Sequence, residues 1–566
     1  MVFALNSLLS LPAQPKPGHR LDLPSFSASI DALAMAQLAR PWQLLTVITA
    51  SPLEAQRLVE EIAWFAPQLR AHLLPDWETL PYDHFSPHQD LVSERLATLH
   101  AVSRNECDVL ITAASTAITR LAPPSFLAGH TFFMKKGDRL DIDKLRAQLT
   151  LAGYQHVTQV VAAGEYSVRG GLIDLFPMGT PLPYRIELFD DEIETLRSFD
   201  VDTQRTLYPV PEIRLLPARE FPSGDAGRII FRQRFRETFE GDASRISLYK
   251  DVSNGIFPAG IEYYLPLFFD TTATLFDYLP AEAQLVLHGD VTDAIAEFWA
   301  DTNSRYKMLG GDRSRPVLPP QQLFLRDEEF FIAANAWPQW TLLKSQKVGA
   351  GDTPQNQNLE SVSGKSPSGT ALATNTYHQL PPLAVDRKAD DPVAYLRSFL
   401  ASEPRRVLLL TESPGRRETL HDYLVTHRLS ADTCADFAEF LLSDNPLMLC
   451  VGPLSGGFLL DGIALITENE LYAATARPRS RRSEARRANL EGWLRDLSEL
   501  TIGDPVVHEQ HGIGRYLGLV HMDLGEGNTE FLHLEYADNA KLYVPVAQLH
   551  VITRYSGADP DRKSVV

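Results

Sequence analysis

Two short segments contain residue types that could bind phosphate or a divalent cation. The Gly-Lys-Ser order at 364–366 ends many phosphate-binding loops, in which backbone amides and a lysine hold the phosphates. The glycine that should begin such a loop would fall at Leu359, however, and Pro367 follows the serine. The acidic run at 327–329 has the composition of a metal-binding helicase box. Without a phosphate loop, an isolated acidic turn is typical of a solvated surface, so we interpret both segments as non-catalytic.

The place where a nucleotide-binding loop belongs is occupied by a different sequence. The apolar run at 44–50 is followed by SPLEAQRL, which has no glycine for a tight loop and no lysine at Ala55 or Gln56. No Ser/His/Asp or Cys/His spacing indicates a nucleophile. We therefore predict no catalytic, cofactor-binding or metal-binding residues in this chain.

Composition limits the class of protein. A chain of 566 residues exceeds a single core and predicts about four domains. Hydrophobic residues make up 44% and charged residues 22%, and the formal charge of −19 disfavours a surface that neutralises nucleic-acid phosphates. Three scattered cysteines argue against disulfides or a cysteine-based zinc site, and neither a signal peptide nor a membrane-spanning run is recognisable. We expect a cytoplasmic protein.

The elements that must position any site follow from hydrophobic periodicity. Strand-like runs at 44–50 and 108–114 alternate with a helical pattern at 51–65, as in an α/β domain with a parallel sheet. This pattern covers 1–122 and resumes over 209–345. The intervening region 123–208 is richer in short strands and turns, which predicts an inserted strand-rich domain.

The second half of the sequence divides into smaller parts. A Gly/Ser/Asn-rich stretch at 346–385 predicts a flexible linker, and a further α/β pattern at 386–475 predicts a small domain. An arginine-rich stretch at 476–502 predicts a helical linker. Short strands around the turn ADNA predict an all-β module at 503–556, and the tail 557–566 lacks periodicity.

The strand YRIELF at 184–189 is the most informative part of the inserted region. Alternation places Arg185, Glu187 and Phe189 on one face. Arginine and aromatic residues together are enriched at the centres of protein interfaces. The alternative is structural: Arg169 and Arg185 would pair with Glu165, Asp174 or Glu187, and Phe189 would pack beneath a neighbouring loop.

The segment at 164–206 closely resembles the insertion domain shared by the excision-repair helicase subunit UvrB and the transcription-repair coupling factors. The resemblance covers Arg169, the strand at 172–176 and the hairpin at 184–199, and the segment at 76–96 resembles the coupling factors as well. It implies that the domain binds the damage sensor UvrA through Arg169, Arg185 and Phe189. It also implies a degenerate UvrB-like, P-loop-derived domain that lacks a phosphate loop.

The segment at 503–555 resembles the RNA polymerase interaction domain of the same family, an SH3- or Tudor-like barrel also found in CarD-type regulators. An apolar run beside Gly518 could present a strand to a partner or could only fill the barrel's core. The resemblance implies a contact to RNA polymerase, expected at the β subunit, through an early hairpin. We assign that contact to Leu517, Leu519, Val520 and Met522.

Together these resemblances predict a multidomain α/β and α+β protein: the degenerate α/β domain with its insertion, the small α/β domain and the C-terminal barrel. They imply a transcription-coupled repair factor that joins UvrA to RNA polymerase. In the family, ATP and Mg²⁺ serve motor lobes that translocate on double-stranded DNA and push polymerase forward. We find no such lobes before the chain ends at Val566, so we expect a truncated product or a fragment that is not an enzyme. The resemblance also implies that the far C-terminal part masks the insertion domain, so this chain should bind UvrA without ATP.

Two other functions remain open from the sequence. An ATP-dependent, UvrB-like DNA helicase subunit would need a phosphate loop after residue 50. A DNA-binding module could use the arginines at 477–495, although the overall acidity favours a solvated linker helix there.

Overall fold

The computed structural model describes residues 8–24, 26, 29–342, 378, 380–386, 389, 391–402, 405–460 and 462–472, together with five strands between 505 and 554. In those strands the side chains are described at 515–518, 520, 532–535 and 541. The Gly-Lys-Ser at 364–366, most of the predicted linker 346–385, the arginine-rich stretch 476–502 and the tail 557–566 lie outside the described residues. The chain divides into two compact units, Met1–Ala474 and Thr475–Val566.

A six-stranded parallel sheet is the centre of the first unit, and its strand order is β1-β14-β13-β2-β4-β3. The strands are β1 Arg20–Asp22, β2 Leu45–Thr49, β3 Ala71–Leu74, β4 Val109–Ala113, β13 Gln284–His288 and β14 Gln339–Leu342. Strands β2, β4, β13 and β14 are buried along their whole length, as expected for strands covered on both faces. The predicted strands at 44–50 and 108–114 are confirmed as β2 and β4.

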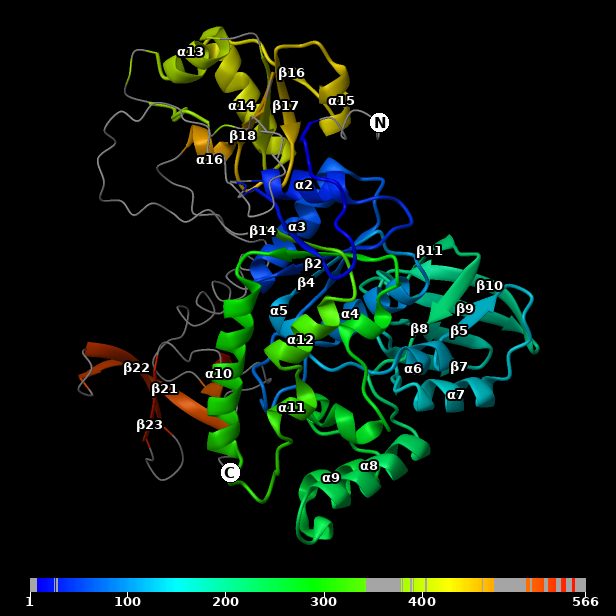
Figure 1. The fold of residues 1–566 in the computed structure, drawn as a ribbon. Coiled ribbons are helices and arrows are strands. Elements are labelled where there is room, and N and C mark those ends of the chain that lie inside the picture. The colour runs from blue at the N-terminus through cyan, green and yellow to red at the C-terminus, as the bar shows by residue number, and fades with distance from the viewer. Residues whose placement is uncertain are drawn as a thin grey trace. The chain divides into compact units, whose positions relative to one another are not determined.

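Helices connect and cover these strands (Figure 1). They are α2 Ile30–Leu38, α3 Pro52–Phe65, α4 Gln89–Ser103, α5 Ala114–Ala117, α10 Val291–Leu309, α11 Pro320–Leu323 and α12 Asp327–Ala334. Helix α3 forms where the periodicity predicts it: Ser51 caps its N-terminus, Pro52 takes the first helical position, and Leu58, Ile62 and Phe65 bury one stripe. The polypeptide therefore passes from β2 into α3 without a glycine-rich loop.

The inserted region forms its own six-stranded sheet, in the order β11-β10-β9-β8-β7-β6. Its strands are β6 Gln155–His156, β7 Glu165–Arg169, β8 Leu172–Leu175, β9 Tyr184–Phe189, β10 Glu192–Phe199 and β11 Thr206–Pro209. Helix α7 (Ile142–Leu151) lies alongside (Figure 1), and its Leu145 and Leu149 share a core with Ile186. A two-stranded sheet pairs β5 (Phe132–Lys135) with β12 (Glu212–Leu215), so strand pairing continues past the predicted boundary at residue 208.

Short helices link the insertion back to the first sheet. They are α6 Pro124–Gly129 before it, and α8 Asp225–Thr238, η1 Ala243–Arg245, α9 Ser247–Ser253, η2 Ile261–Phe268 and η3 Leu275–Tyr278 after it. Their buried aromatic residues extend the same continuous core, which joins the insertion to one face of the first sheet.

A second α/β module follows, with the sheet order β16-β17-β15-β19-β18. Its elements are α13 Ala394–Ser402, β15 Arg406–Thr411, α14 Pro414–Thr426, β16 Asp432–Thr433, α15 Phe437–Leu442, β17 Leu447–Val451, β18 Phe458–Leu460, β19 Ile463–Thr467 and α16 Glu468–Leu471. Phe437 and Phe458 belong to the same core as Phe65 of α3. This module is therefore packed against the first sheet rather than tethered beside it.

The second unit contains one antiparallel sheet in the order β23-β22-β21-β20-β24. Its strands are β20 Pro505–His508, β21 Gly512–Asp523, β22 Asn528–Glu535, β23 Lys541–Pro545 and β24 Ile552–Arg554. Pairing of Glu535 with Lys541 confirms the hairpin predicted around the turn ADNA.

None of the helices within the described part of the chain has both the length and the apolar character needed to cross a bilayer.

Candidate functional site

One face of the inserted sheet is organised around the buried carboxylate of Asp174. Arg185 donates two hydrogen bonds to this carboxylate, from Nε to Oδ1 at 2.7 Å and from Nη2 to Oδ2 at 3.0 Å. Arg169 adds a longer contact, from Nη2 to Oδ2 at 3.3 Å. One carboxylate on β8 therefore holds two arginines, one from β7 and one from β9.

Arg185 is largely enclosed by its neighbours. Its side chain is 16% exposed, its Nη1 donates to the carbonyl oxygen of Gln204 at 3.1 Å, and its guanidinium lies 4.9 Å from the centre of the Phe199 ring. The hydrogen bond to Asp174 raises the pKa of Arg185 above its usual value. Arg169, by contrast, keeps 55% of its side chain exposed.

Phe189 projects into solvent at the end of β9. It is 74% exposed, although Ile186 on the opposite face of the strand is completely buried. The strand then turns at Asp190, whose φ of 60° is in the left-handed region that aspartate tolerates. The predicted hairpin tip at Asp190 and Asp191 is confirmed by the pairing of Phe189 with Glu192.

The sequence left two interpretations of this face, and each is correct for part of it. The arginines do pair internally, and of the three acids considered their partner is Asp174. Phe189 is not packed beneath a loop. The structure thus brings Arg169, Arg185 and Phe189 onto one sheet face, which we call the arginine face, with Arg185 inside it and the other two exposed.

A buried ion-pair network occupies the carboxyl end of the first sheet, between β2 and β13. Arg57 of α3 donates to Asp31 (Nη1 to Oδ1, 3.0 Å), to Glu54 (Nε to Oε2, 2.9 Å) and to Glu61 (Nη1 to Oε2, 2.7 Å). His288, at the end of β13, places Nε2 2.8 Å from Asp31 Oδ2. In doubly wound sheets the crevice at the point where the strand order reverses is the usual ligand site. Here side chains fill that crevice, and a phosphate would meet three carboxylates.

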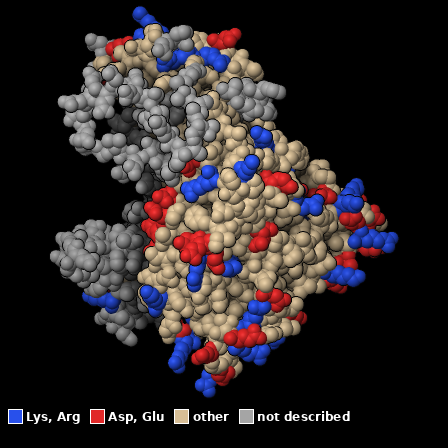
Figure 2. All heavy atoms as spheres, in the orientation of Figure 1, with Lys and Arg blue, Asp and Glu red and all other residues tan. Residues whose placement is uncertain are grey.

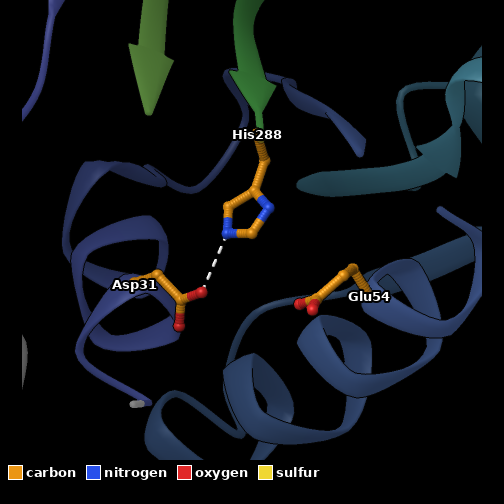
Figure 3. A group of neighbouring side chains, drawn as sticks. All are labelled: Asp31, Glu54 and His288. Atoms are coloured by element: carbon orange, nitrogen blue, oxygen red, sulfur yellow. Dashed lines mark hydrogen bonds and ion pairs between the residues drawn. The ribbon is translucent and has the colours of Figure 1, made fainter. Parts of the chain in front are cut away.

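Asp31, Glu54 and His288 have the geometry of a cation site, because their ligand atoms lie within 4.8 Å of one another (Figure 3). The Arg57 guanidinium, however, already donates to both carboxylates. It supplies the positive charge that a metal ion would otherwise provide, so the geometry does not support a metal here. Sequence reasoning missed this network, because the pairing of Asp31 with His288 spans 257 positions.

The small α/β module closes over the same crevice. The backbone N–H of Ser455 donates to Glu61 Oε1 at 2.8 Å, and the indole of Trp64 donates to the carbonyl oxygen of Val451 at 3.0 Å. Gly452 permits this approach, since a Cβ there would lie 2.9 Å from the Trp64 ring. The ion-pair network is therefore also part of the contact between the module and the first sheet.

Acid should weaken the fold through Asp31. Burial alone would raise the pKa of Asp31, but the charge of Arg57 and the hydrogen bond from His288 more than offset this, so the pKa lies well below its usual range. The unfolded chain therefore binds this proton at a higher pH, and stability is lost as pH falls below about 4. We expect the urea midpoint of wild-type protein to fall more steeply between pH 5 and pH 3 than that of Asp31→Asn. Equal slopes would show that Asp31 is not the group responsible.

The acidic run at 327–329 forms the first turn of α12. Glu329 accepts a hydrogen bond from the backbone N–H of Arg326, and all three acids are exposed. Acidic side chains in the first turn stabilise a helix because their negative charge interacts favourably with the positive end of the helix dipole. This agrees with the interpretation of the run as a solvated surface.

The strand pairing of the second unit divides the four predicted polymerase-contact residues. Position 519 pairs with Leu532, which is buried, whereas position 520 pairs with Phe531. Positions 520 and 522 therefore share the face opposite Leu532. Leu517 sits at a register shift in β21, and its side chain and that of Val520 are half-buried. The side chains of Leu519 and Met522 lie outside the described residues.

Comparison with known proteins identifies three parts of the chain. A model of the UvrB interaction domain matches residues 132–221, a model of the MFD D3 domain matches 399–471, and a model of the CarD-like/TRCF RID domain matches 500–556. A transcription-repair-coupling factor from Escherichia coli is 42% identical over 547 residues, which is 96% of this chain. The chain is a relative of the transcription-repair-coupling factors.

Other transcription-repair-coupling factors match over a similar range. The one from Haemophilus influenzae is 39% identical over 97% of this chain, and the one from Myxococcus xanthus is 28% identical over 86%. The chain spans about half the length of these curated relatives, 46% for the first two. The matched UvrB interaction domain begins at β5 and extends beyond β12, so it contains the whole inserted sheet and the arginine face.

Proposed function

We propose that this chain acts in transcription-coupled nucleotide excision repair by joining two partners, UvrA and RNA polymerase. The observation that carries the proposal is the exposed Phe189 beside arginines anchored on Asp174, within the part matched as a UvrB interaction domain. Exposed aromatic and arginine residues on a preformed surface are characteristic of interface centres. Arg169, Arg185 and Phe189 form the UvrA-binding site in this proposal.

The second contact is assigned to the C-terminal sheet, which we propose closes into an SH3- or Tudor-like barrel and binds RNA polymerase, at its β subunit. The match over 500–556 supports this assignment. Of the residues proposed for the contact, Leu517, Val520 and Met522 are the better placed, because position 519 pairs with the buried Leu532.

Joining two partners does not require nucleotide chemistry at the first sheet. Arg57 and three carboxylates fill the crevice where a nucleotide would bind. We propose that the ATP- and Mg²⁺-dependent movement on double-stranded DNA that the family resemblance implies does not use the described crevice of the first sheet. The interspersed acidic and basic side chains on the face seen in Figure 2 form no extended basic surface for DNA there.

The proposal is tested by measuring the affinity of the purified chain for UvrA and for RNA polymerase separately, without ATP. Removal of residues 503–556 should abolish polymerase binding and leave UvrA binding unchanged, because that segment belongs to the separate second unit. Phe189→Ala should instead weaken UvrA binding and leave polymerase binding unchanged. If the deletion removed both affinities, or neither, the assignment of two independent contacts would be wrong.

A further inference from the structure

Arg197 of β10 is the cross-strand neighbour of Arg185. The register of β9 and β10 places the two residues directly opposite each other, so they share one face of the sheet. Arg197 is exposed, and within the described part of the chain it forms no ion pair or side-chain hydrogen bond. Like charges directly opposite each other in a sheet are mildly destabilising. Asp174 neutralises Arg185, which leaves Arg197 as an additional positive charge on the arginine face.

The surroundings of Arg197 are those of a contact surface. Pro209 pairs with Arg197 on the edge strand β11 and is exposed, and Leu207, two residues earlier on the same strand, is 52% exposed. Glu187, the acid between the arginines and Phe189, accepts a hydrogen bond from Thr195 at 2.7 Å. An exposed arginine beside exposed apolar residues thus extends the arginine face toward β11.

We propose that Arg197 is a further UvrA-contacting residue and that Arg185 mainly positions the face. This inference rests on the proposed function. Arg185 donates to Asp174 and Gln204, whereas Arg197 is exposed and has no side-chain partner among the described residues, and Arg169 is half exposed. The exposed guanidinia are therefore the ones available to carboxylates of a partner.

The charge distribution around Phe189 also indicates which charges the binding surface of UvrA should carry. Asp190, Asp191 and Glu192 lie exposed at the tip of the hairpin, beyond Phe189, and Asp191 forms an ion pair with Arg139 at 3.8 Å. A complementary surface would place carboxylates over Arg169 and Arg197, an apolar pocket over Phe189, and basic groups near the tip. Salt should weaken such a contact.

The test compares Arg197→Glu with Arg146→Glu in the full chain. Arg146 is an exposed arginine on α7, the helix that packs on the opposite face of the sheet through Leu145 and Leu149. We expect Arg197→Glu to weaken UvrA binding by about tenfold or more and to reduce its salt dependence, with polymerase affinity unchanged. Arg146→Glu should leave both affinities at the wild-type level.

Phe189→Ala separates the failure of this inference from the failure of the proposed function. If Phe189→Ala weakens UvrA binding but Arg197→Glu and the neutral Arg197→Gln do not, the assignment of Arg197 is wrong and the arginine face remains the site. If neither position affects binding, UvrA does not use this face. The unfolding midpoint of each variant, expected to be unchanged because the side chains are exposed, excludes loss of folding as the cause.

Discussion

Replacing Phe189 by alanine should weaken UvrA binding by about 2 kcal/mol or more, roughly thirtyfold in affinity. The ring is 74% exposed in the free chain, so removing it eliminates area for the partner without opening a cavity in the core. The unfolding midpoint should therefore stay within the range expected for a surface substitution, about 0.5 kcal/mol. Calorimetric titration with UvrA and urea unfolding of the same preparations would measure both quantities.

Phe133 supplies a matched control for this experiment. It is a phenylalanine of the same domain, on β5, and is 54% exposed. Phe133→Ala should leave UvrA affinity unchanged, because β5 pairs with β12 in the separate two-stranded sheet. Equal losses of affinity for the two variants would mean that general surface hydrophobicity, rather than the arginine face, determines binding.

Arg185→Ala should behave differently from Phe189→Ala. It removes both hydrogen bonds that Arg185 makes to the buried Asp174, and leaves that carboxylate with the single longer contact from Arg169. We expect a loss of about 2 kcal/mol in the stability of the inserted domain, together with weaker UvrA binding. Normal stability combined with lost binding would show that Arg185 contacts the partner directly.

Arg57→Ala should lower the free energy of unfolding by about 3–5 kcal/mol, because removing one member of a buried ion-pair network leaves its partners uncompensated. Glu61 is completely buried, and burial already raises its pKa. Its other oxygen accepts the Ser455 N–H, so the contact with the small module should loosen as well. Urea unfolding measures the total, and hydrogen exchange at residues 451–456 reports the contact.

The exposed Arg416, which forms an ion pair with Glu468, serves as the control for Arg57. Its Nη1 lies 3.0 Å from Glu468 Oε2, and its side chain is 56% exposed, against 19% for Arg57. Arg416→Ala should change stability by no more than about 1 kcal/mol, as is typical of surface ion pairs. If Arg57→Ala were equally mild, the network would not hold the module in place.

Local pattern was sufficient to predict the elements that carry the proposed interface. Alternation in YRIELF predicts which residues share a face with Phe189, and the periodicity at 51–65 predicts α3 with its Ser51 cap. Such features depend on neighbours within a few residues, so a single sequence contains them. The exposure of Phe189 could not be decided in the same way, because a covering loop could come from anywhere in the chain.

Features that depend on contacts between distant segments could not be predicted from the sequence. The pairing of β5 with β12 joins segments on either side of the insertion, and the filled crevice depends on Asp31, Arg57 and His288 from three separate segments. The i, i+3 spacing of Arg57 with Glu54 and its i, i+4 spacing with Glu61 on α3 were local signals of that network. Nor did the sequence indicate that Phe437 would share a core with Phe65.

Simultaneous binding of both partners by a single chain can be observed by mass photometry of the chain mixed with UvrA and RNA polymerase in the absence of ATP. We expect a ternary complex that contains all three, that loses UvrA with Phe189→Ala and loses polymerase when residues 503–556 are removed. Binary complexes alone, with each partner displacing the other, would contradict the proposal that this chain joins them.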